Sequence, residues 1–509
     1  MTATSVPVVI VGAGPTGITA ATLLAGYGVD VLVLDRWEGV YPQPRAVHMD
    51  DESMRILARL GIADEFAAIS RPALGLRLLD KTHRVLAEFG RSTDVGVHGY
   101  PQANMYDQPD LEHLLRTNLK NYPQAVLRGN VEVTDVTDDR RGRVRVTYTD
   151  RGTGTDHVVD ADYVLGCDGA NSLVRKTIGT TMTDWRFDQR WLVVDIATTA
   201  DLGQWEGVHQ VCDPVRAATY MRIGPTRYRW EFRLLPTESA NDFAGLPALA
   251  PLIGPWTGGV DDRDLEVIRV AEYTFRARIA DRWRSGPIFL LGDAAHLTPP
   301  FIGQGLCAGL RDAMNLAWKL AGVLRGDLPE VALDSYQAER KPHARYMIAT
   351  ALGMGKAMTA GGRLGDALRQ VIAPRIHMIP GLRAKLVDGS TPALRRSACI
   401  DARRRLRPGL AGRLAPNVLL ANGRRLDDVQ GGGFAVITGT PPSGEQRAVI
   451  DARGARLVIP DPGTELAAWL SRGRAEAAVV RPDGTVMAAG PHLDTVLPKL
   501  PTFRPQEPR

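Results

Sequence analysis

Gly12, Gly14 and Gly17 follow a short apolar run with the G-x-G-x-x-G spacing that phosphate binding requires. The first glycine permits a tight turn, and the second lets a pyrophosphate approach the backbone. The third lets a helix pack closely on a strand, so that the helix N-terminus faces the phosphates. Asp35 ends the next apolar run, where a carboxylate can bind ribose hydroxyls. The pattern favours a dinucleotide site over an ordinary glycine turn, but it does not separate NAD from FAD.

Two later segments place an aspartate beside a glycine after a strand-like run. Asp168-Gly169 precedes Ser172, a candidate helix cap. Gly292-Asp293 ends a buried run and leads through a glycine loop into a long helix. An aspartate there can accept hydrogen bonds from a polyol, and the free N–H groups at the helix start can hold negative charge. A flavin needs both, because it has a ribityl chain and a ring edge that becomes anionic on reduction; taken singly, each segment also fits a structural turn.

Apolar patterns predict the elements that hold these loops. Continuous aliphatic runs are typical of strands buried on both faces of a parallel sheet, and apolar residues repeating every three or four positions are typical of helices. The predicted buried strands are 8–11, 31–34 and 288–291. The predicted helices are 18–27, 51–60, 110–119 and about 304–324, and residues 345–400 read as helical and irregular. A meander is predicted at 131–164, a sheet-rich insertion at 181–278, and an α/β tail after a basic linker at 401–413.

Composition narrows the class of protein. The chain has 509 residues, a net charge of +5 and 44% hydrophobic residues, which is long enough for about three domains and too apolar for wholesale disorder. Charges of both signs are interspersed, which favours a mildly basic surface over a nucleic-acid partner. The 4 cysteines stand far apart without a C-x-x-C pair, so we expect neither a zinc site nor a disulfide framework. No apolar run is long enough for a membrane span, and a cytoplasmic location is expected.

The three segments, in this order, resemble those of the single-component FAD-dependent aromatic hydroxylases, a group of flavoprotein monooxygenases. The likeness is strongest to the 3-(3-hydroxyphenyl)propionate hydroxylase and phenol hydroxylase branch. It is carried by Pro44-Arg45-Ala46, Asp50-Asp51-Glu52 and the segments 191–196, 212–216 and 229–232. The resemblance implies an α/β fold with a Rossmann-like FAD-binding domain at 1–180 and 279–400. It also implies an inserted, mainly antiparallel substrate sheet at 181–278 and a thioredoxin-like domain at 411–509, which without C-x-x-C is not expected to be redox-active.

Site residues follow from the same resemblance. The implied FAD contacts are Gly12, Gly14, Pro15, Thr16, Gly17, Asp35, Arg36, Arg45, Gln108, Asp168, Gly292, Asp293, Pro300, Gly303, Gly305 and Leu306. Pro300 would wall the flavin ring, and His48 is a catalytic candidate beside it, with Val47 competing for the same position. His296 is expected to pack or hydrogen-bond locally. The substrate candidates are Arg216, Tyr220 and Arg229, for which an ion pair on a sheet face is the alternative.

The implied activity is the hydroxylation of a small phenolic substrate with O₂, through a flavin C4a-hydroperoxide, with NADH or NADPH as a transient reductant. The resemblance also allows a homodimer, and we expect no metal and no membrane partner. Two alternatives remain open. One is a flavin-dependent tailoring oxygenase that performs Baeyer–Villiger oxidation or epoxidation on a polyketide-like substrate. The other is a non-catalytic protein that binds flavin or a ligand.

Overall fold

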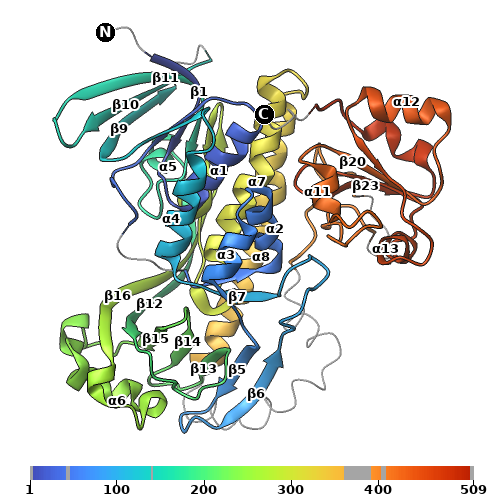
Figure 1. The fold of residues 1–509 in the computed structure, drawn as a ribbon. Helices are drawn as coiled ribbons and strands as arrows, with labels where there is room; N and C mark the ends of the chain where they lie inside the picture. The colour runs from blue at the N-terminus through green and yellow to red at the C-terminus, as the bar shows by residue number, and fades with distance from the viewer. Residues whose placement is uncertain (1–3, 42–45, 139–141, 360–390, 403–408, 505–509) are drawn as a thin grey trace.

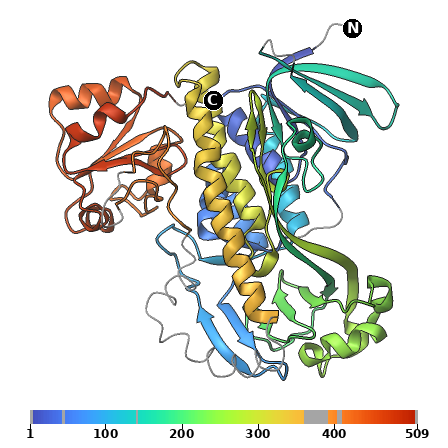
Figure 2. The ribbon, with the colours of Figure 1, turned by 180° about the vertical axis from the view of Figure 1, so that it is seen from behind.

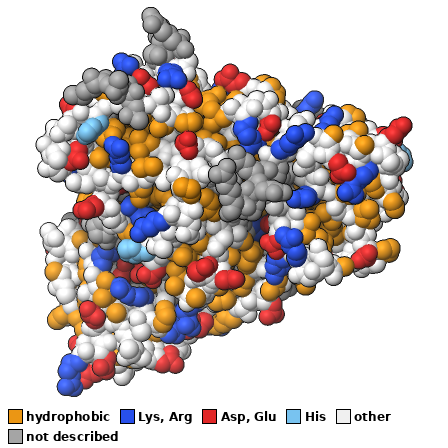
Figure 3. All heavy atoms as spheres, turned by 45° about the horizontal axis from the view of Figure 1, so that its top comes forward, with side chains coloured by type: hydrophobic (Ala, Val, Ile, Leu, Met, Phe, Trp, Pro, Cys, Tyr) orange, Lys and Arg blue, Asp and Glu red, His pale blue; other side chains and the backbone are white. Residues whose placement is uncertain are grey.

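The structure is a computed structural model that describes residues 4–41, 46–138, 142–359, 391–402 and 409–504. Within these residues the fold is mixed α/β, with two 8-stranded sheets, a 4-stranded sheet and a 3-stranded sheet. Figure 1 shows the C-terminal residues as a separate lobe beside the long helices α7 and α8. On the face shown in Figure 3, basic and acidic side chains are interspersed with apolar ones.

The first sheet has a parallel centre with the strand order β17-β18-β11-β1-β2-β8. Its strands are β1 (Thr4–Val11), β2 (Val31–Leu34), β8 (Ala125–Arg128), β11 (Asp156–Gly166), β17 (Arg284–Ser285) and β18 (Ile288–Leu290), with β9 (Val131–Asp138) and β10 (Val144–Asp150) extending it beyond β11. Val8, Val9 and Ile10 are 0% exposed, as expected for a central strand of a parallel sheet. The predicted strand 31–34 and the meander at 131–164 are confirmed.

The register of this sheet brings the three predicted loops to one edge. Val11 pairs with Leu34 on one side and with Gly166 on the other, and Gly166 pairs with Leu290. All three pairings are parallel, so the carboxyl ends of β2, β1, β11 and β18 form one row. In open α/β sheets, ligands bind in the crevice beyond such ends, where the strand order reverses.

The helices packed around the first sheet are visible from both sides (Figure 1 and Figure 2): α1 (Pro15–Gly26), α2 (Asp51–Arg59), α3 (Ala63–Ile69), α4 (Gln108–Leu119), α5 (Leu173–Thr177), α7 (Gly305–Leu324) and α8 (Val331–Thr359). The helix predicted at 110–119 begins two residues earlier, because Pro109 fits the first turn, where no N–H is needed. The helix predicted at about 304–324 is confirmed as α7. The predicted helical region 345–400 is α8 up to Thr359, and 360–390 lie outside the described residues.

The second sheet has the order β19-β16-β12-β15-β14-β13-β5-β6. Its strands are β5 (Gly75–Leu79), β6 (Val85–Gly90), β12 (Met182–Ala197), β13 (Val208–Val211), β14 (Ala218–Arg222), β15 (Arg227–Arg233), β16 (Glu266–Ala280) and β19 (His296–Leu297). It therefore reaches beyond the predicted insertion at 181–278, because β13 pairs in parallel with β5 and β16 pairs with β19. Side chains on one face pack against α6 (Leu246–Thr257) in an aromatic and aliphatic cluster.

Besides the two large sheets there is a short 3-stranded sheet, and the tail forms a 4-stranded sheet of its own. The short sheet contains β3 (His48–Asp50), β7 (Ala103–Met105) and β4 (Arg71–Pro72). The tail contains β20 (Ala435–Thr438), β21 (Arg456–Val458), β22 (Ala477–Val480), β23 (Val486–Gly490), α11 (Leu426–Gln430), α12 (Gly444–Ala452) and α13 (Glu465–Arg472). One face of the tail sheet, with Val436 and Val479, belongs to the main core, and the other, with Ile437 and Val480, packs within the tail.

Candidate active site

The glycine loop is tight at two positions and open at the third. Gly12 has φ +103°, and a Cβ there would lie 2.4 Å from the carbonyl oxygen of Cys167. A Cβ at Gly17 would lie 2.0 Å from the carbonyl oxygen of Gly12. At Gly14, by contrast, a Cβ would meet nothing within 4 Å, and no side chain caps α1 at this residue. Gly14 therefore leaves room for a phosphate beside uncapped N–H groups at the helix start, which fits a dinucleotide pyrophosphate.

Asp35 lies at the end of β2 and orders the loop. Its carboxylate accepts hydrogen bonds from the N–H of Ala13 at 2.5 Å and of Trp37 at 2.7 Å. The neighbouring Arg36 extends into solvent and pairs with Glu132 at 2.7 Å. The geometry therefore favours Asp35 as a cofactor contact, whereas Arg36 forms an ion pair on the surface.

Asp168 in the second loop is engaged by its own segment. It accepts hydrogen bonds from the Ser172 hydroxyl at 2.5 Å and the Val174 N–H at 3.1 Å, and burial raises its pKa. Ser172 accepts from the N–H of Arg175 at 2.9 Å, so the predicted helix cap is confirmed. The Arg175 guanidinium donates to the carbonyl oxygen of Ala294 at 3.0 Å. Arg175 thereby ties the second loop to the third.

A buried cluster of charged side chains holds the third loop, which contains Gly292 and Asp293. Asp312 on α7 accepts from the Gly292 N–H at 3.1 Å, lies 2.8 Å from Nε2 of His296, and pairs with Arg340 at 2.8 Å. His296 is 0% exposed, which confirms the expected local role. Asp293 follows Gly292 in a short 3₁₀ turn (Gly292–Ala294) and is only partly buried.

The segment before α7 has the geometry expected beside a flavin ring. Pro300–Ile302 form a 3₁₀ turn, Gly303 follows in the left-handed region with φ +63°, and Gly305 starts α7. Gln304 precedes the helix without a side-chain cap, so the N–H groups of the first turn remain available to an anionic group. The polar edge that a reduced flavin presents fits this helix start.

His48 on β3 lies against the same segment. Its Nδ1 is 3.3 Å from the carbonyl oxygen of Gly303, and a Cβ at Gly303 would come within 2.9 Å of the His48 side chain. Burial and the positive charge of Arg91 lower the His48 pKa to about 4. The imidazole is therefore neutral near pH 7 and, with Nδ1 donating to Gly303, has an acceptor nitrogen at Nε2.

A charged network that sequence reasoning missed locks the start of α7 to α2. Arg311 donates to Asp50 at 2.6 Å, to Glu52 at 3.0 Å and to the amide oxygen of Gln304 at 3.0 Å. The Gln304 amide nitrogen donates in turn to Asp50 at 2.8 Å. The run Asp50-Asp51-Glu52 carries part of the family resemblance, but only the fold shows that Arg311 binds Asp50 and Glu52.

The α4 helix presents three polar side chains along one face, spaced four residues apart. Gln108 accepts from the Ala46 N–H at 2.7 Å and donates to Glu112 at 2.6 Å. Arg116, one turn further, lies 3.4 Å from the carbonyl oxygen of Ala13, and its Nε is buried without a partner among the described residues. Sequence reasoning missed this cation beside the glycine loop, although the spacing could have found it. The predicted contact Arg45 lies outside the described residues.

The three substrate candidates do not converge. Arg216 pairs with Glu238 at 2.5 Å, and Arg229 forms a buried pair with Asp195 at 2.6 Å. Tyr220 packs on the opposite face of the sheet, against Trp256 of α6. These contacts favour the alternative of ion pairs on the sheet for both arginines, and a core position for Tyr220.

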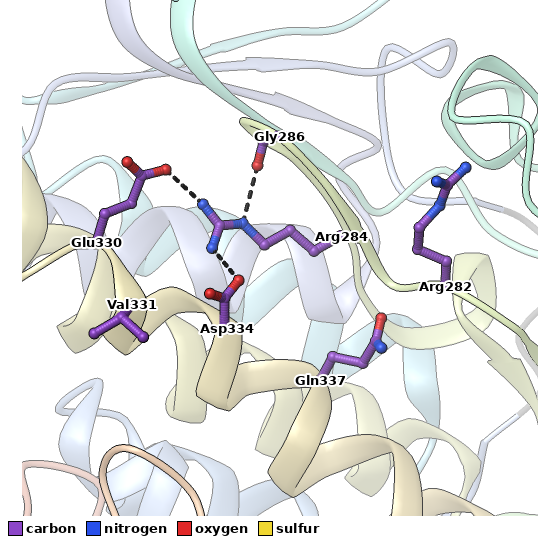
Figure 4. A pocket seen from close by; sticks show the side chains of 7 residues that line it. All are labelled: Arg282, Arg284, Gly286, Glu330, Val331, Asp334 and Gln337. Atoms are coloured by element: carbon purple, nitrogen blue, oxygen red, sulfur yellow. Dashed lines mark hydrogen bonds and ion pairs between the residues drawn. The ribbon is translucent and has the colours of Figure 1, made fainter.

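The hollow drawn in Figure 4 lies around Arg284 and has a volume of about 600 Å³. The Arg284 guanidinium donates to Glu330 at 2.7 Å, to Asp334 at 2.5 Å and to the carbonyl oxygen of Gly286. Because its charge is already paired and no predicted cofactor residue lines the hollow, we assign it no binding role. Among the described residues, no group of His, Cys, Asp or Glu could hold a metal ion, and no helix is long and apolar enough to cross a membrane.

Converging loops, an open Gly14 and an uncapped α7 together define an FAD-binding α/β protein. A family model described as "FAD binding domain" matches residues 5–351. The chain belongs to this family, within the FAD-dependent aromatic hydroxylases.

Curated relatives match almost the whole chain. The "Probable NADH-specific resorcinol 4-hydroxylase" of Rhodococcus jostii is 33% identical over 501 residues, covering 95% of this chain and 91% of the relative. The "3-(3-hydroxy-phenyl)propionate/3-hydroxycinnamic acid hydroxylase" of Burkholderia cenocepacia is 34% identical over 521 residues, covering 94% and 93%.

Solved structures show the same fold. The flavin-dependent monooxygenase PieE, in complex with FAD and substrate, has a TM-score of 0.79 at 25% identity and covers 97% of this chain and 98% of its own. Aklavinone-11 hydroxylase, in a ternary complex with FAD and aklavinone, has a TM-score of 0.79 at 26% identity, with coverage of 98% and 99%.

Proposed function

We propose that this protein is a monooxygenase that uses FAD, NADH or NADPH, and O₂ to hydroxylate a small phenolic compound. The observation that carries the proposal is the single row formed by the ends of β2, β1, β11 and β18, from which all three cofactor loops start. The aromatic hydroxylases among the relatives support the reaction class. When bound, FAD supplies the electron storage and oxygen activation that no side chain can provide.

In this proposal, the residues of the chain bind FAD and orient its parts. The loop from Gly12 to Gly17 holds the pyrophosphate, Asp35 the ribose, and Asp293 the ribityl chain. On α4, Gln108 holds the backbone N–H of Ala46, and Arg116 lies beside the glycine loop, where it would neutralise phosphate charge. Pro300 and the start of α7 border the flavin ring, and neutral His48 offers its Nε2 as a hydrogen-bond acceptor.

The proposed domain arrangement follows the sheets. The first sheet with its helices would form the FAD-binding domain at 1–180, without β5 and β6, and at 279–400. The second sheet would form the substrate domain, with β5 and β6 added to residues 181–278. The tail at 411–509 would be the thioredoxin-like domain, with a packing role. The face of the second sheet away from α6 would then close the substrate site.

The test uses the purified full chain reconstituted with FAD. Resorcinol and 3-(3-hydroxyphenyl)propionate, together with a polycyclic phenol, are screened for stimulated oxidation of NADH and NADPH. We expect one O₂ consumed per product, and one ¹⁸O atom from ¹⁸O₂ in a new ring hydroxyl detected by mass spectrometry. Oxygen inserted into a carbon–carbon bond or an epoxide would replace the proposal with a tailoring oxygenase. FAD binding without substrate-stimulated turnover on any phenol would favour a binding protein.

A further inference from the structure

Strand β15 has two chemically different faces. Trp230 and Phe232 pack in the cluster beneath α6, whereas Arg229 and Glu231 alternate onto the opposite face. Pairing places Glu231 opposite Val193 on β12 and opposite Thr219 on β14. Directly opposed residues in a sheet share a face, so these side chains form one row across three strands.

The row continues to the segment that precedes α7. Thr219 pairs with Gln210 on β13, and the Gln210 amide nitrogen donates to the carbonyl oxygen of Phe301 at 3.0 Å. Phe301 directly follows Pro300, which we place beside the flavin ring. With strands about 4.8 Å apart, Glu231 lies two strands, or roughly 10 Å, from Gln210 along this row.

Two apolar clusters flank Glu231 on the same face. One contains Trp191 and Ala217 together with Phe301. The other contains Met221 with Val47, the residue before His48. Each cluster includes a segment of the candidate active site, so the face that carries Glu231 is directed towards that site.

Around Glu231, the positive charges of two arginines face the negative charges of two other carboxylates. Asp195 on β12 pairs with Arg229 at 2.6 Å and with Arg269 on β16 at 2.8 Å, and Asp107 acts on Arg229 from the start of α4. Glu231 is 8% exposed and accepts no hydrogen bond from any residue that the structure describes. The two arginines therefore hold Asp195, and the Glu231 carboxylate beside them is left to interact with a ligand.

We propose that Glu231 is the base that accepts the phenolic proton of the substrate. This inference rests on the proposed function. The substrate O–H bond breaks and a carboxyl O–H bond forms, so the combined charge of enzyme and substrate is unchanged. Arg229 and Arg269 remain positively charged beside Glu231 and stabilise the phenolate that results. A phenolate ring is more electron-rich than the phenol, which favours attack on oxygen.

The pKa values of the two candidates favour Glu231 over His48 as the base. Burial and the negative charge of Asp195 raise the Glu231 pKa to about 7, against the opposing effect of Arg229. The His48 pKa is lowered to about 4. The Glu231 carboxylate therefore accepts a proton from a phenol more readily than the His48 imidazole does. A general base works best when its pKa lies near the working pH.

The experiment compares Glu231→Gln with the wild type and with Glu272→Gln, which removes a partly exposed carboxylate of the same sheet, paired with Arg190. In the wild type, kcat/KM for 3-(3-hydroxyphenyl)propionate should rise with pH through about 7. Glu231→Gln should lower kcat/KM by about 10²- to 10⁴-fold and abolish that limb, with FAD content unchanged. Glu272→Gln should behave as the wild type. A Glu231→Gln variant with the wild-type profile would overturn the inference.

A second measurement needs no turnover and separates this inference from the proposed function. Oxidised holoenzyme is mixed with resorcinol at pH 8 under nitrogen, and ultraviolet difference spectra report whether the bound phenol ionises. After rapid mixing, the phenolate band should form with wild type and Glu272→Gln, and about 10²-fold more slowly with Glu231→Gln, which has no carboxylate to accept the proton. If Glu231→Gln does not fold, Glu231→Asp should also form the band more slowly than the wild type; an unchanged rate would overturn the inference. Phenolate formation without hydroxylated product would overturn only the proposed function.

Discussion

At the scale of single residues, the three loop glycines differ in what surrounds them. Gly12 and Gly17 face backbone carbonyl oxygens at distances that no Cβ tolerates, so they are required by the fold itself. Gly14 has φ −70° and ψ 178°, a conformation open to any residue, and faces empty space. The fold alone gives no reason for a glycine at this position, whereas a bound pyrophosphate does.

A Gly14→Ala variant tests this difference. We expect the apoprotein to keep or slightly raise its thermal stability, since replacing glycine at a compatible site adds about 0.4–1 kcal/mol. Its Kd for FAD, measured by quenching of flavin fluorescence, should rise at least about tenfold, because a Cβ would occupy the phosphate position. Gly444→Ala, where a Cβ also meets nothing within 4 Å, is the matched control and should bind FAD normally. Unchanged affinity in Gly14→Ala would place the phosphate elsewhere.

The glycine loop, Asp35 and the residues around Asp293 could be predicted from sequence because each motif is local. Glu231 could not, although it lies in the segment 229–232 that resembles the family, because its importance depends on the residues opposite it on β12 and β14. The same limit applies to Arg311, which contacts residues more than 250 positions away. Arg216 and Arg229 were predicted as substrate anchors because a cation near an active site has the same appearance in sequence as one half of an ion pair.

At the scale of elements, α7 can approach α1 closely because two glycines, Gly292 and Gly309, leave space for the Thr16 side chain. Thr16 on α1 lies against Gly292 and Gly309, and a Cβ at Gly309 would come within 2.2 Å of the Thr16 hydroxyl oxygen. This close packing fixes the distance between α1, which starts at the glycine loop, and α7, which starts where we place the flavin ring. Strand β2 was predicted from its local apolar run, whereas the pairing of β13 with β5 joins segments about 130 residues apart and has no local signal.

A double-variant cycle measures this packing. Gly309→Ala should lower the free energy of unfolding of the apoprotein by about 1–3 kcal/mol through overpacking. Adding Thr16→Ala removes the clashing hydroxyl and leaves contacts of 3.3 Å or more, so part of the loss should be recovered. Urea unfolding of both single variants and the double variant gives the coupling energy. Strictly additive losses would show that Thr16 does not transmit the strain.

At the scale of the whole molecule, the tail is joined to the FAD-binding part by apolar packing and by buried charges. Phe434 and Phe503 of the tail pack edge-on against Trp318 of α7. Beside them, Glu339 of α8 pairs with Lys319 of α7 and with Arg481 of the tail, each at 2.9 Å. Arg481 also pairs with Asp483. All three side chains of the Lys319–Glu339–Arg481 group are 0% exposed, so a buried ion-pair network joins the tail to α7 and α8.

The pH dependence of stability reports this junction. The positive charges of Arg481 and Lys319 lower the Glu339 pKa from 4.5 to about 2, against the effect of burial. A carboxyl with a depressed pKa stabilises the fold above its unfolded pKa and loses that contribution as the pH falls towards the folded value. The difference corresponds to roughly 3 kcal/mol.

Glu339→Gln keeps the side-chain shape and removes the charge. Its free energy of unfolding at pH 7 should be about 3–5 kcal/mol below that of the wild type, because buried Lys319 loses its carboxylate and Arg481 keeps only Asp483. The gap should narrow steadily between about pH 5 and pH 2 as the wild-type carboxyl becomes protonated. Urea unfolding across this range measures the gap, and Glu476→Gln, which removes a half-exposed carboxylate of the tail, should remain within about 0.5 kcal/mol of the wild type. A Glu339→Gln variant as stable as the wild type at pH 7 would show that shape rather than charge joins the tail to α7 and α8.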